Sequence, residues 1–464
     1  MVGVLAVSTL TIAQSARQPD WTRLEDETMR HFQAIVRLDT SNPPGNEVLV
    51  TDYLKQVLEK ESIPVRIFAS EPSRPNLVAR IKGSGKKDPV LYMGHTDVVT
   101  VDPKKWVFPP FSATRNGGYV YGRGALDDKP HVVAGLMIML ELKRLNVPLD
   151  RDVIFLAESG EEGTTGPGID FMTREHAADI RAEYCFAEGG GVARVGGRTR
   201  FASVQTTEKV PRPIELTATG PSGHASVPLR ANAISRLSAA LAALSAWRVP
   251  IRLNATTREY FARMGAISTG AEAQRYRAVL TPQSREAGAA DEYFLQNEPR
   301  LASMLRTSLS PTIVHGGYRV NVIPSEAKAT VDVRMVPDED PTAFLEAVRK
   351  VINDPAVTVA YAAASERPMA PPARLDSEAF RAIETFLAQD YDTVALPTMG
   401  TGATDMAQVR SVGLQCYGIG PATDFEDGAK GFGAHSDQER ILETELHRFV
   451  RFSWNLVAGL SRSK

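Results

Sequence analysis

Residues 90–99 read Val-Leu-Tyr-Met-Gly-His-Thr-Asp-Val-Val, and the fold prediction starts from this stretch. Its apolar run is typical of a buried strand that ends at Gly94. Residues two apart in extended backbone point to the same side, so His95 and Asp97 should leave the sheet end together. Imidazole is the commonest metal ligand, and a carboxylate can hold its other ring nitrogen. A lone His-x-Asp is more often part of a surface turn than of a metal site. Further motifs along the chain are needed to distinguish these two interpretations.

The composition is that of a globular protein with more than one domain. The chain has 464 residues, of which 43% are apolar and 23% are charged, and its net charge is −2. This length suggests two or three domains, and the balanced charge argues against nucleic acid as a partner. The two cysteines, Cys185 and Cys416, lie in apolar, strand-like runs and are expected to be buried free thiols.

The N-terminal segment, residues 1–20, has features of a signal sequence. Residues 2–12 are apolar, and the small residues at 13–16 (Ala-Gln-Ser-Ala) could form a cleavage site, although a charged region before the apolar run is missing. We expect a periplasmic or secreted protein if this segment is a signal, and a cytoplasmic one otherwise. The run is too short to span a membrane, and no later stretch is predicted to span one.

Strands alternate with helices on both sides of residues 90–99, and this pattern predicts an α/β/α sandwich with a mixed sheet. The expected helices before residue 210 are 26–39, 47–61 and 130–146. The expected strands there are 65–69, 76–81, 90–99, 152–157 and 183–187. After residue 371 the pattern resumes with a helix at 377–389, a strand at 414–419 and a helix from about residue 439.

The middle of the chain has a different order, β-α-β-β-α-β, which is typical of a ferredoxin-like α+β domain. Its expected strands are 214–218, 318–322, 327–333 and 357–362, and its expected helices are 232–247 and 342–353. Residues 257–308 are expected to form inserted helices. We therefore predict a catalytic domain in two parts, 21–209 and 369–464, with an inserted lid and dimerisation domain at 210–368.

Five potential metal ligands follow predicted strands or lie in loops: His95, Asp127, Glu162, Glu188 and His435. Open α/β sheets bind ligands at the carboxyl ends of their strands. Nitrogen and oxygen donors of this kind suit zinc, with cobalt or manganese as replacements. Five ligands are too many for one tetrahedral zinc, but they fit two metals if one carboxylate bridges them.

Six motifs occur in a specific order along the chain. They are Gly-His-Thr-Asp-Val-Val at 94–99, Trp106 with Pro-Pro-Phe at 109–111, Gly-Arg-Gly-Ala-Leu-Asp-Asp-Lys at 122–129, Glu-Glu-Gly at 161–163, Gly-His-Ala-Ser at 223–226 and a late His435. In this combination, from about residue 24 to the C-terminus, the sequence resembles the dinuclear zinc peptidases and deacylases. That family includes aminoacylase, acetylornithine deacetylase, succinyl-diaminopimelate desuccinylase, glutamate carboxypeptidase and carboxypeptidase S.

The resemblance implies a role for each ligand. Asp127 would bridge two zinc ions in each subunit. His95 and Glu188 would complete one metal site, and Glu162 and His435 would complete the other.

The resemblance also assigns two residues that are not ligands. Asp97 would orient His95, and Glu161 would be the general base. In a tight turn, adjacent carboxylates can point differently, so Glu161 can face water while Glu162 faces metal. The alternative is that this acidic pair belongs to an ordinary charged loop.

The remaining assignments concern the substrate. His224 would stabilise the oxyanion, often in the partner subunit's active site, and Asn321 would touch the substrate. Arg334 would grip a carboxylate with two hydrogen bonds, unless it is only a surface charge on a strand. Gly402 and Thr404 belong to a loop whose backbone N–H groups suit a carboxylate.

The expected activity is metal-dependent cleavage of an amide bond in a peptide or N-acyl amino acid that bears a free carboxylate, as in a carboxypeptidase or aminoacylase, by a homodimer. One alternative is a dipeptidase or aminopeptidase with the same two-metal chemistry. Another is a phosphate-directed two-metal enzyme, whose groove should be more basic. A third is an inactive, metal-stabilised binding protein, against which an intact Glu161 argues.

Overall fold

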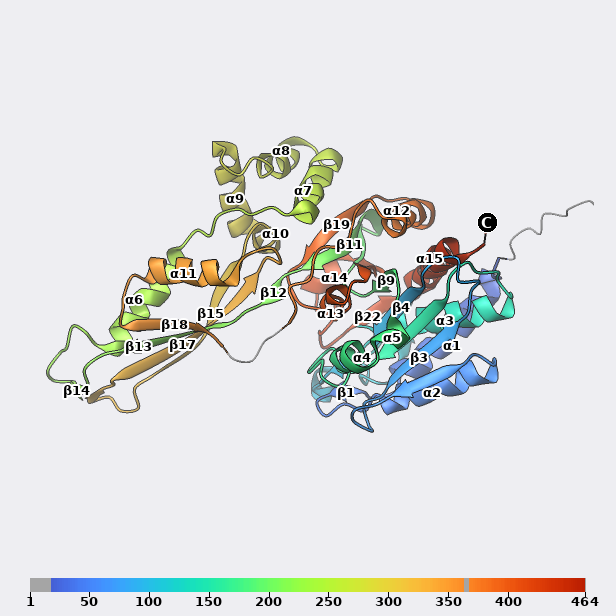
Figure 1. The fold of residues 1–464 in the computed structure, drawn as a ribbon, viewed down its shortest axis with the longest axis horizontal. Helices are drawn as coiled ribbons and strands as arrows, with labels where there is room; N and C mark the ends of the chain where they lie inside the picture. Colours follow the sequence, from blue (N-terminus) through green and yellow to red (C-terminus); the bar gives the residue numbers. More distant parts are fainter. Residues whose placement is uncertain (1–17, 363–366, 464) are drawn as a thin grey trace, which may run out of the picture.

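Two sheets lie well apart along the longest axis of the molecule (Figure 1). This computed structural model describes residues 18–362 and 367–463. Residues 2–12, the apolar part of the predicted signal, lie outside the described residues. Within the described ranges, no helix is both long enough and apolar enough to cross a membrane.

The larger sheet has ten strands and is mixed, as predicted. Strand β4 runs parallel to both of its neighbours, whereas β3 is antiparallel to β8. In spatial order, with β19 (Ala395–Gly400) beside β11, the strands are β2 (Val65–Phe68), β3 (Asn76–Ile81), β8 (Val153–Glu158), β4 (Val90–His95), β9 (Tyr184–Ala187), β20 (Gln415–Gly418), β11 (Arg198–Glu208), β10 (Gly191–Val195) and β21 (Ala422–Asp424).

The alternation of side chains along β4 explains why helices cover both faces of this sheet. Val90 and Tyr92 belong to one apolar core, and Leu91 and Met93 belong to another. The helices of the first core are α1 (Trp21–Val36), α2 (Val48–Lys60), α3 (Lys129–Arg144), α12 (Glu378–Tyr391) and α15 (Glu443–Ser461). Those of the second are α4 (Ile169–Glu175), α5 (Ala177–Ile180) and α13 (Met406–Ser411). The predicted α/β/α sandwich is confirmed.

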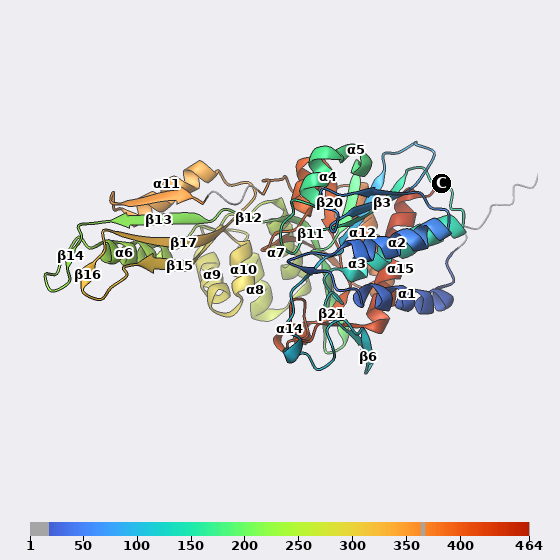
Figure 2. The ribbon, with the colours of Figure 1, turned by 90° about the horizontal axis from the view of Figure 1, so that it is seen from below.

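The second sheet is antiparallel, and its strand order is that of a ferredoxin-like domain. Its members are β15 (Ser308–Gly316), β17 (Glu326–Met335), β13 (Ile214–Thr219) and β18 (Val357–Tyr361) in spatial order, with β12 (Val210–Pro211) extending β13 along β17. Figure 2 shows α6 (Ala233–Ala246) and α11 (Pro341–Ile352) beside these strands. The sheet therefore forms an arm that extends away from the larger sheet.

One predicted strand of this arm is wrong. Residues 318–322 form a loop up to residue 321, and the strand that pairs with β17 is β15. Gly317 has φ +73, a left-handed conformation that turns the chain out of the strand. Strand β15 lacks a clear apolar alternation because it lies at the edge of the sheet, with much of its length exposed.

Four helices fill the predicted insertion: α7 (Ala255–Ile267), α8 (Gly270–Ala278), α9 (Arg285–Asn297) and α10 (Pro299–Met304). They share an apolar core with Phe201, Leu396 and Met399, which belong to β11 and β19 of the larger sheet. The helices therefore pack against the larger sheet, and Figure 1 shows α7 beside β19.

The remaining elements are short. They are β1 (Ser41–Asn42), β5 (Val98–Val99), the 3₁₀ helix Pro103–Lys105, β6 (Thr114–Asn116), β7 (Tyr119–Tyr121), β14 (Gly223–His224), β16 (Val322–Ile323), α14 (Phe425–Ala429) and β22 (Arg440–Leu442). Cys185 and Cys416 lie side by side on β9 and β20 as buried free cysteines, as expected. The predicted domain limits at 209/210 and 368/369 stay predictions.

Candidate metal centre

The parallel strands at the centre of the larger sheet carry polar side chains at their carboxyl ends. His95 is the last residue of β4, Glu188 follows β9, and Glu161 and Glu162 follow β8. A Cβ on Gly94 would come within 2.8 Å of the His131 Cβ and 3.0 Å of an Asp128 oxygen. The missing side chain therefore lets the start of α3, with the Asp127–Asp128 turn, approach β4.

One group of donors consists of His95, Asp127 and Glu188, whose potential ligand atoms lie within 4.8 Å of one another. The His95 Nε2 atom is 3.0 Å from Asp127 Oδ1 and 3.8 Å from Glu188 Oε2. His95 is 1% exposed, so its ring is fixed by the surrounding protein.

A second group consists of Asp127, Glu162 and His435. His435 Nε2 lies 3.1 Å from Asp127 Oδ2 and 2.9 Å from Glu162 Oε1. His435 has φ +61, a left-handed conformation that costs a residue other than glycine about 1–3 kcal/mol and is concentrated at functional sites. The two oxygens of Asp127 thus face different histidines, as a bridging carboxylate requires.

The donor set fits two divalent cations. It contains two imidazoles and three carboxylates, the ligand types that zinc takes in proteins. Burial alone would lower the pKa of His95, but its hydrogen bonds to Asp127 and Asp97 raise that pKa well above its usual value. Burial opposes ionisation of Asp127, yet the two histidines lower its pKa. The carboxylates therefore favour positive charge at these positions, whether protons or metal cations carry it.

Asp97 supports both His95 and the acidic turn. Its Oδ1 lies 3.5 Å from His95 Nδ1 and accepts the Glu161 N–H at 3.2 Å. Its Oδ2 accepts the Glu162 N–H at 3.1 Å and an Asn42 amide hydrogen at 2.8 Å. The sequence predicted contact with His95, but the link to the turn that carries Glu161 and Glu162 depends on the fold.

We expect Asp97→Asn to lower kcat/KM by about 10–100-fold, the usual effect of losing a partner of a metal ligand. The new amide group would direct N–H donors at the N–H groups of Glu161 or Glu162, which disturbs the turn. Steady-state kinetics and metal content by mass spectrometry check this, and we expect most of the metal to remain. Asp102→Asn is the control, because Asp102 also accepts a backbone N–H, from Lys104, but at the surface. Full activity in Asp97→Asn would contradict the assigned support.

Glu161 belongs to neither group of donors but is close to them. Gly160, at φ +84, makes the turn that separates Glu161 from the end of β8. Burial raises the pKa of Glu161 well above its usual value, and the charges of Asp405 and Asp127 add to this effect. A carboxyl group with a raised pKa is suited to take up and release a proton near neutral pH.

The sequence did not identify Glu439 and Arg123 as parts of this centre. The Glu439 carboxylate is fully buried and accepts the backbone N–H groups of Leu126 at 2.7 Å and Asp127 at 3.1 Å. Its other oxygen accepts a hydrogen bond from Arg123. Glu439 thereby ties the chain segment after His435 to the turn that holds Asp127. Its spacing of four residues from His435 was the available signal, but such a spacing has many meanings.

His224 and Asn321 lie far from the two groups of donors within this chain. His224 is on β14 at the tip of the arm, at the opposite end of the molecule from β4 (Figure 1). Both residues are exposed, and the Asn321 carbonyl accepts the Ala225 N–H at 3.1 Å. The fold thus brings these two residues together, but far from the two groups of donors of their own chain.

Three other predicted substrate residues lie near the junction of the two sheets. Arg334 is on β17 beside β12 and donates to Asp332 at 3.0 Å. Gly402 lies in the loop after β19, and a Cβ there would meet no atom within 4 Å. Thr404 donates both its N–H and its hydroxyl to Glu208, at 2.9 and 2.8 Å, so both donors that could face a substrate are already used to anchor the loop.

Several known proteins are similar to this chain in sequence. A probable carboxypeptidase S-like protein of Dictyostelium discoideum is 29% identical over 81% of this chain and 72% of that protein. A probable succinyl-diaminopimelate desuccinylase of Staphylococcus epidermidis is 29% identical over 71% of this chain and 73% of that protein. The human N-fatty-acyl-amino acid synthase/hydrolase is 26% identical over 66% of this chain and 59% of that protein.

Solved structures share the fold. An M20 family metallo-carboxypeptidase from Sulfolobus solfataricus superposes with a TM-score of 0.67 at 21% identity, covering 93% of this chain and 99% of that one. A dinuclear metal-binding M20 peptidase from Bacillus subtilis gives a TM-score of 0.61 at 15% identity, covering 95% of this chain and 99% of that one. The model of Peptidase family M20/M25/M40 matches residues 91–458. This match, together with two groups of side chains that could hold metal ions, shows that the chain is a metal-dependent hydrolase and belongs to peptidase family M20/M25/M40.

Proposed function

We propose that this enzyme cleaves the amide bond of a peptide or N-acyl amino acid that carries a free carboxylate. The observation that supports this most directly is the pair of donor groups that share Asp127, with the half-buried Glu161 beside them. Arg334 and the loop that contains Gly402 would hold the carboxylate, and Thr404 would keep that loop in place through Glu208.

His95, Asp127 and Glu188 would hold one metal ion, and Asp127, Glu162 and His435 would hold the other. Divalent cations bound there would supply Lewis acidity that polarises the scissile carbonyl and lowers the pKa of a water molecule. We propose zinc as the native metal, because its usual ligands in proteins are those present, with cobalt or manganese as replacements.

Glu161 would take a proton from the attacking water and pass it to the nitrogen of the leaving amine. This order of events uses one carboxyl group first as a base and then as an acid. The imidazole of His224 would stabilise the negative charge that develops on the carbonyl oxygen. An oxyanion donor of this kind is worth about 10²–10³-fold in kcat.

A substrate panel tests this function. Purified protein loaded with Zn²⁺ is assayed with N-acyl amino acids, free-amine dipeptides and nitrophenyl phosphate, with and without a chelator. We expect hydrolysis of the N-acyl amino acids that stops when the metal is removed. Exclusive cleavage of free-amine dipeptides would favour a dipeptidase or aminopeptidase. Cleavage of the phosphate alone, or binding of N-acyl amino acids without turnover, would overturn the proposal.

We also propose a homodimer formed through the arm. Strand β15 pairs with β17 on one side, and its other side lies at the edge of the second sheet. Ile313 and Val314 on this strand are 48% and 59% exposed, and Ile234 on α6 is 40% exposed. An edge strand with apolar side chains is a template for pairing with another chain, and a two-fold axis would place two copies of β15 side by side.

Mixing two inactive variants should restore activity if His224 acts in the partner subunit. We expect Glu161→Gln and His224→Ala to be almost inactive alone. In a mixed dimer, the subunit with intact Glu161 would receive His224 from the partner subunit. Random mixing would therefore restore about a quarter of wild-type activity, since half of the dimers are mixed and each has one complete site.

The measurement is kcat after the two variants are unfolded and refolded together, compared with each variant refolded alone. Val314→Asp added to both variants is the control, because it should keep the subunits apart. No recovery, with mixed dimers present by native mass spectrometry, would contradict the exchange of His224 between subunits.

A further inference from the structure

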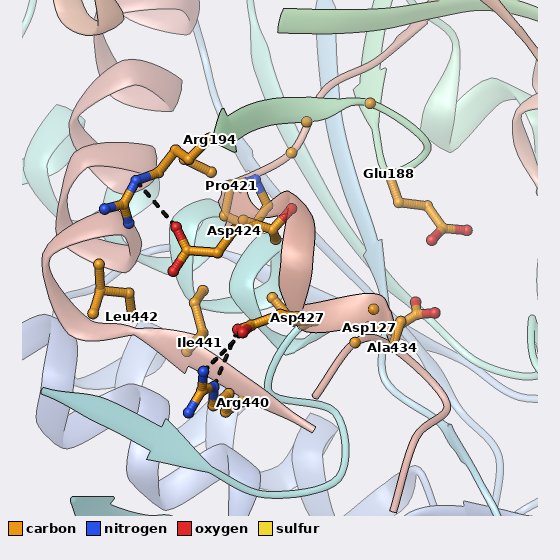
Figure 3. Close-up of a pocket in the computed structure, with 18 of the residues that line it drawn as sticks. Asp127, Glu188, Arg194, Pro421, Asp424, Asp427, Ala434, Arg440, Ile441 and Leu442 are labelled. Atoms are coloured by element: carbon orange, nitrogen blue, oxygen red, sulfur yellow. Dashed lines mark hydrogen bonds and ion pairs between the residues drawn. The ribbon is translucent and has the colours of Figure 1, made fainter. Parts of the chain in front are cut away.

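A cavity of about 420 Å³ lies beside Asp127 and Glu188 (Figure 3). Its volume falls within the range of pockets that bind small molecules. We propose that this cavity holds the acyl group of the substrate and selects an uncharged, apolar acyl chain. This inference rests on the proposed amide hydrolysis and adds the class of group that is cleaved off.

The position of the cavity suits the acyl part of the substrate and not its amino acid part. Its lining includes ligands of the first donor group but none of Arg334, Gly402 and Thr404. Those residues lie where the free carboxylate of the amino acid would bind. If the carbonyl lies at the donor groups and the carboxylate binds to Arg334, the cavity is left free for the acyl chain.

Several walls of the cavity are apolar. Leu126 and Leu442 line it and are partly exposed, so their side chains can contact a bound group. Ile419 and Ile441 lie behind this surface and are buried. Phe425 also lines the cavity and is 73% exposed, so its ring is accessible to a bound group.

Two arginines in the wall already face carboxylates. Arg440 donates to both oxygens of Asp427, at 2.7 and 3.1 Å, and Arg194 lies 3.6 Å from Asp424. Figure 3 shows both pairs on the same side of the cavity. A carboxylate on the acyl chain would compete with Asp427 or Asp424 for these guanidinium groups, whereas an alkyl chain would leave both pairs intact.

One further cation, Arg300 of α10, lines the cavity but is exposed. A solvent-exposed charge contributes little to binding because water and salt screen it. Arg300 therefore does not make the cavity a site for acidic groups.

The test compares N-acetyl, N-butanoyl, N-hexanoyl and N-succinyl derivatives of one amino acid. For the wild-type protein, kcat/KM should rise by up to about fourfold for each added methylene, the ratio that corresponds to burying one CH₂. The N-succinyl derivative should be cleaved more slowly than the N-butanoyl derivative, although both have four acyl carbons.

Gly428→Phe should remove this preference by filling the cavity. Gly428 lines the cavity, and a Cβ there would meet no atom within 4 Å, so a side chain can start at this position without a clash at its Cβ. We expect the rise from acetyl to hexanoyl to disappear, because the ring occupies the space that a longer acyl chain would need. Gly288→Phe is the matched control, since Gly288 is also helical, lacks neighbours within 4 Å and lies on α9 away from the cavity.

The outcomes separate this inference from the proposed function. If no amide substrate is cleaved by the metal-loaded wild type, the proposed function fails. If amides are cleaved but N-succinyl is preferred, or chain length has no effect, the inference about the cavity is wrong. An unchanged chain-length profile in Gly428→Phe, with a normal melting temperature, would also overturn it.

Discussion

Replacing Glu161 by glutamine is expected to lower kcat by about 10²–10⁴-fold, the usual contribution of a positioned general base. The amide of glutamine has nearly the same shape but cannot accept a proton from water. Because the proton moves only in the transition state, KM should change little. The melting temperature should not fall, since burial and the charges of Asp405 and Asp127 make ionised Glu161 costly in the fold.

Steady-state kinetics, metal content and thermal melting of the same preparation measure these effects together. Glu175→Gln is the matched control, because Glu175 is an exposed carboxylate at the end of α4. An active Glu161→Gln variant with two metals bound would mean that another group takes the proton. A variant that loses its metals would instead place Glu161 among the ligands.

The second large effect is expected for Asp127→Asn. Both oxygens of Asp127 face a histidine, at 3.0 and 3.1 Å, so one substitution weakens both donor groups. Loss of the metals removes several kcal/mol of transition-state stabilisation, which is about 10³-fold in rate or more. Metal content should fall well below two ions per chain, and added Zn²⁺ should not restore full activity.

Two variants that each affect only one donor group provide the comparison with Asp127→Asn. Glu188→Ala and His435→Ala each remove a donor from one group only. We expect each to retain about one tightly bound metal ion per chain, whereas Asp127→Asn retains fewer. If Asp127→Asn keeps two ions with unchanged affinity, Asp127 does not bridge the metals.

Sequence patterns were most informative for the strand before His95 and for the candidate metal ligands. The apolar run before His95 predicted β4, and its two-sided alternation explains why helices cover both faces. The predicted ligands, at five positions spread from residue 95 to residue 435, lie within two small groups in the structure. Strand ends of a parallel sheet meet at one edge, which explains why His95, Glu162 and Glu188 come together. Asp127 and His435 lie in loops, and the resemblance to the zinc peptidases implied their place beside the others.

Features that depend on tertiary contacts were not predictable in the same way. The edge strand β15 was missed because its exposed side chains lack the alternation of a half-buried strand. The buried pair of Glu439 and Arg123 was missed because charged residues are normally exposed, and only the fold shows that they are buried together. Thr404 anchors its own loop by donating a hydrogen bond to Glu208. This contact was not predictable, because Glu208 is almost 200 residues away in sequence.

We propose that two metal ions, joined by Asp127, support amide hydrolysis with Glu161 as the base. The most direct measurement is a titration of metal-free protein with Zn²⁺ in which the initial rate of N-acyl amino acid hydrolysis is followed against bound metal. We expect the rate to rise with bound metal and to reach its plateau at two ions per chain. A plateau at one ion, or no hydrolysis with two ions bound, would contradict it.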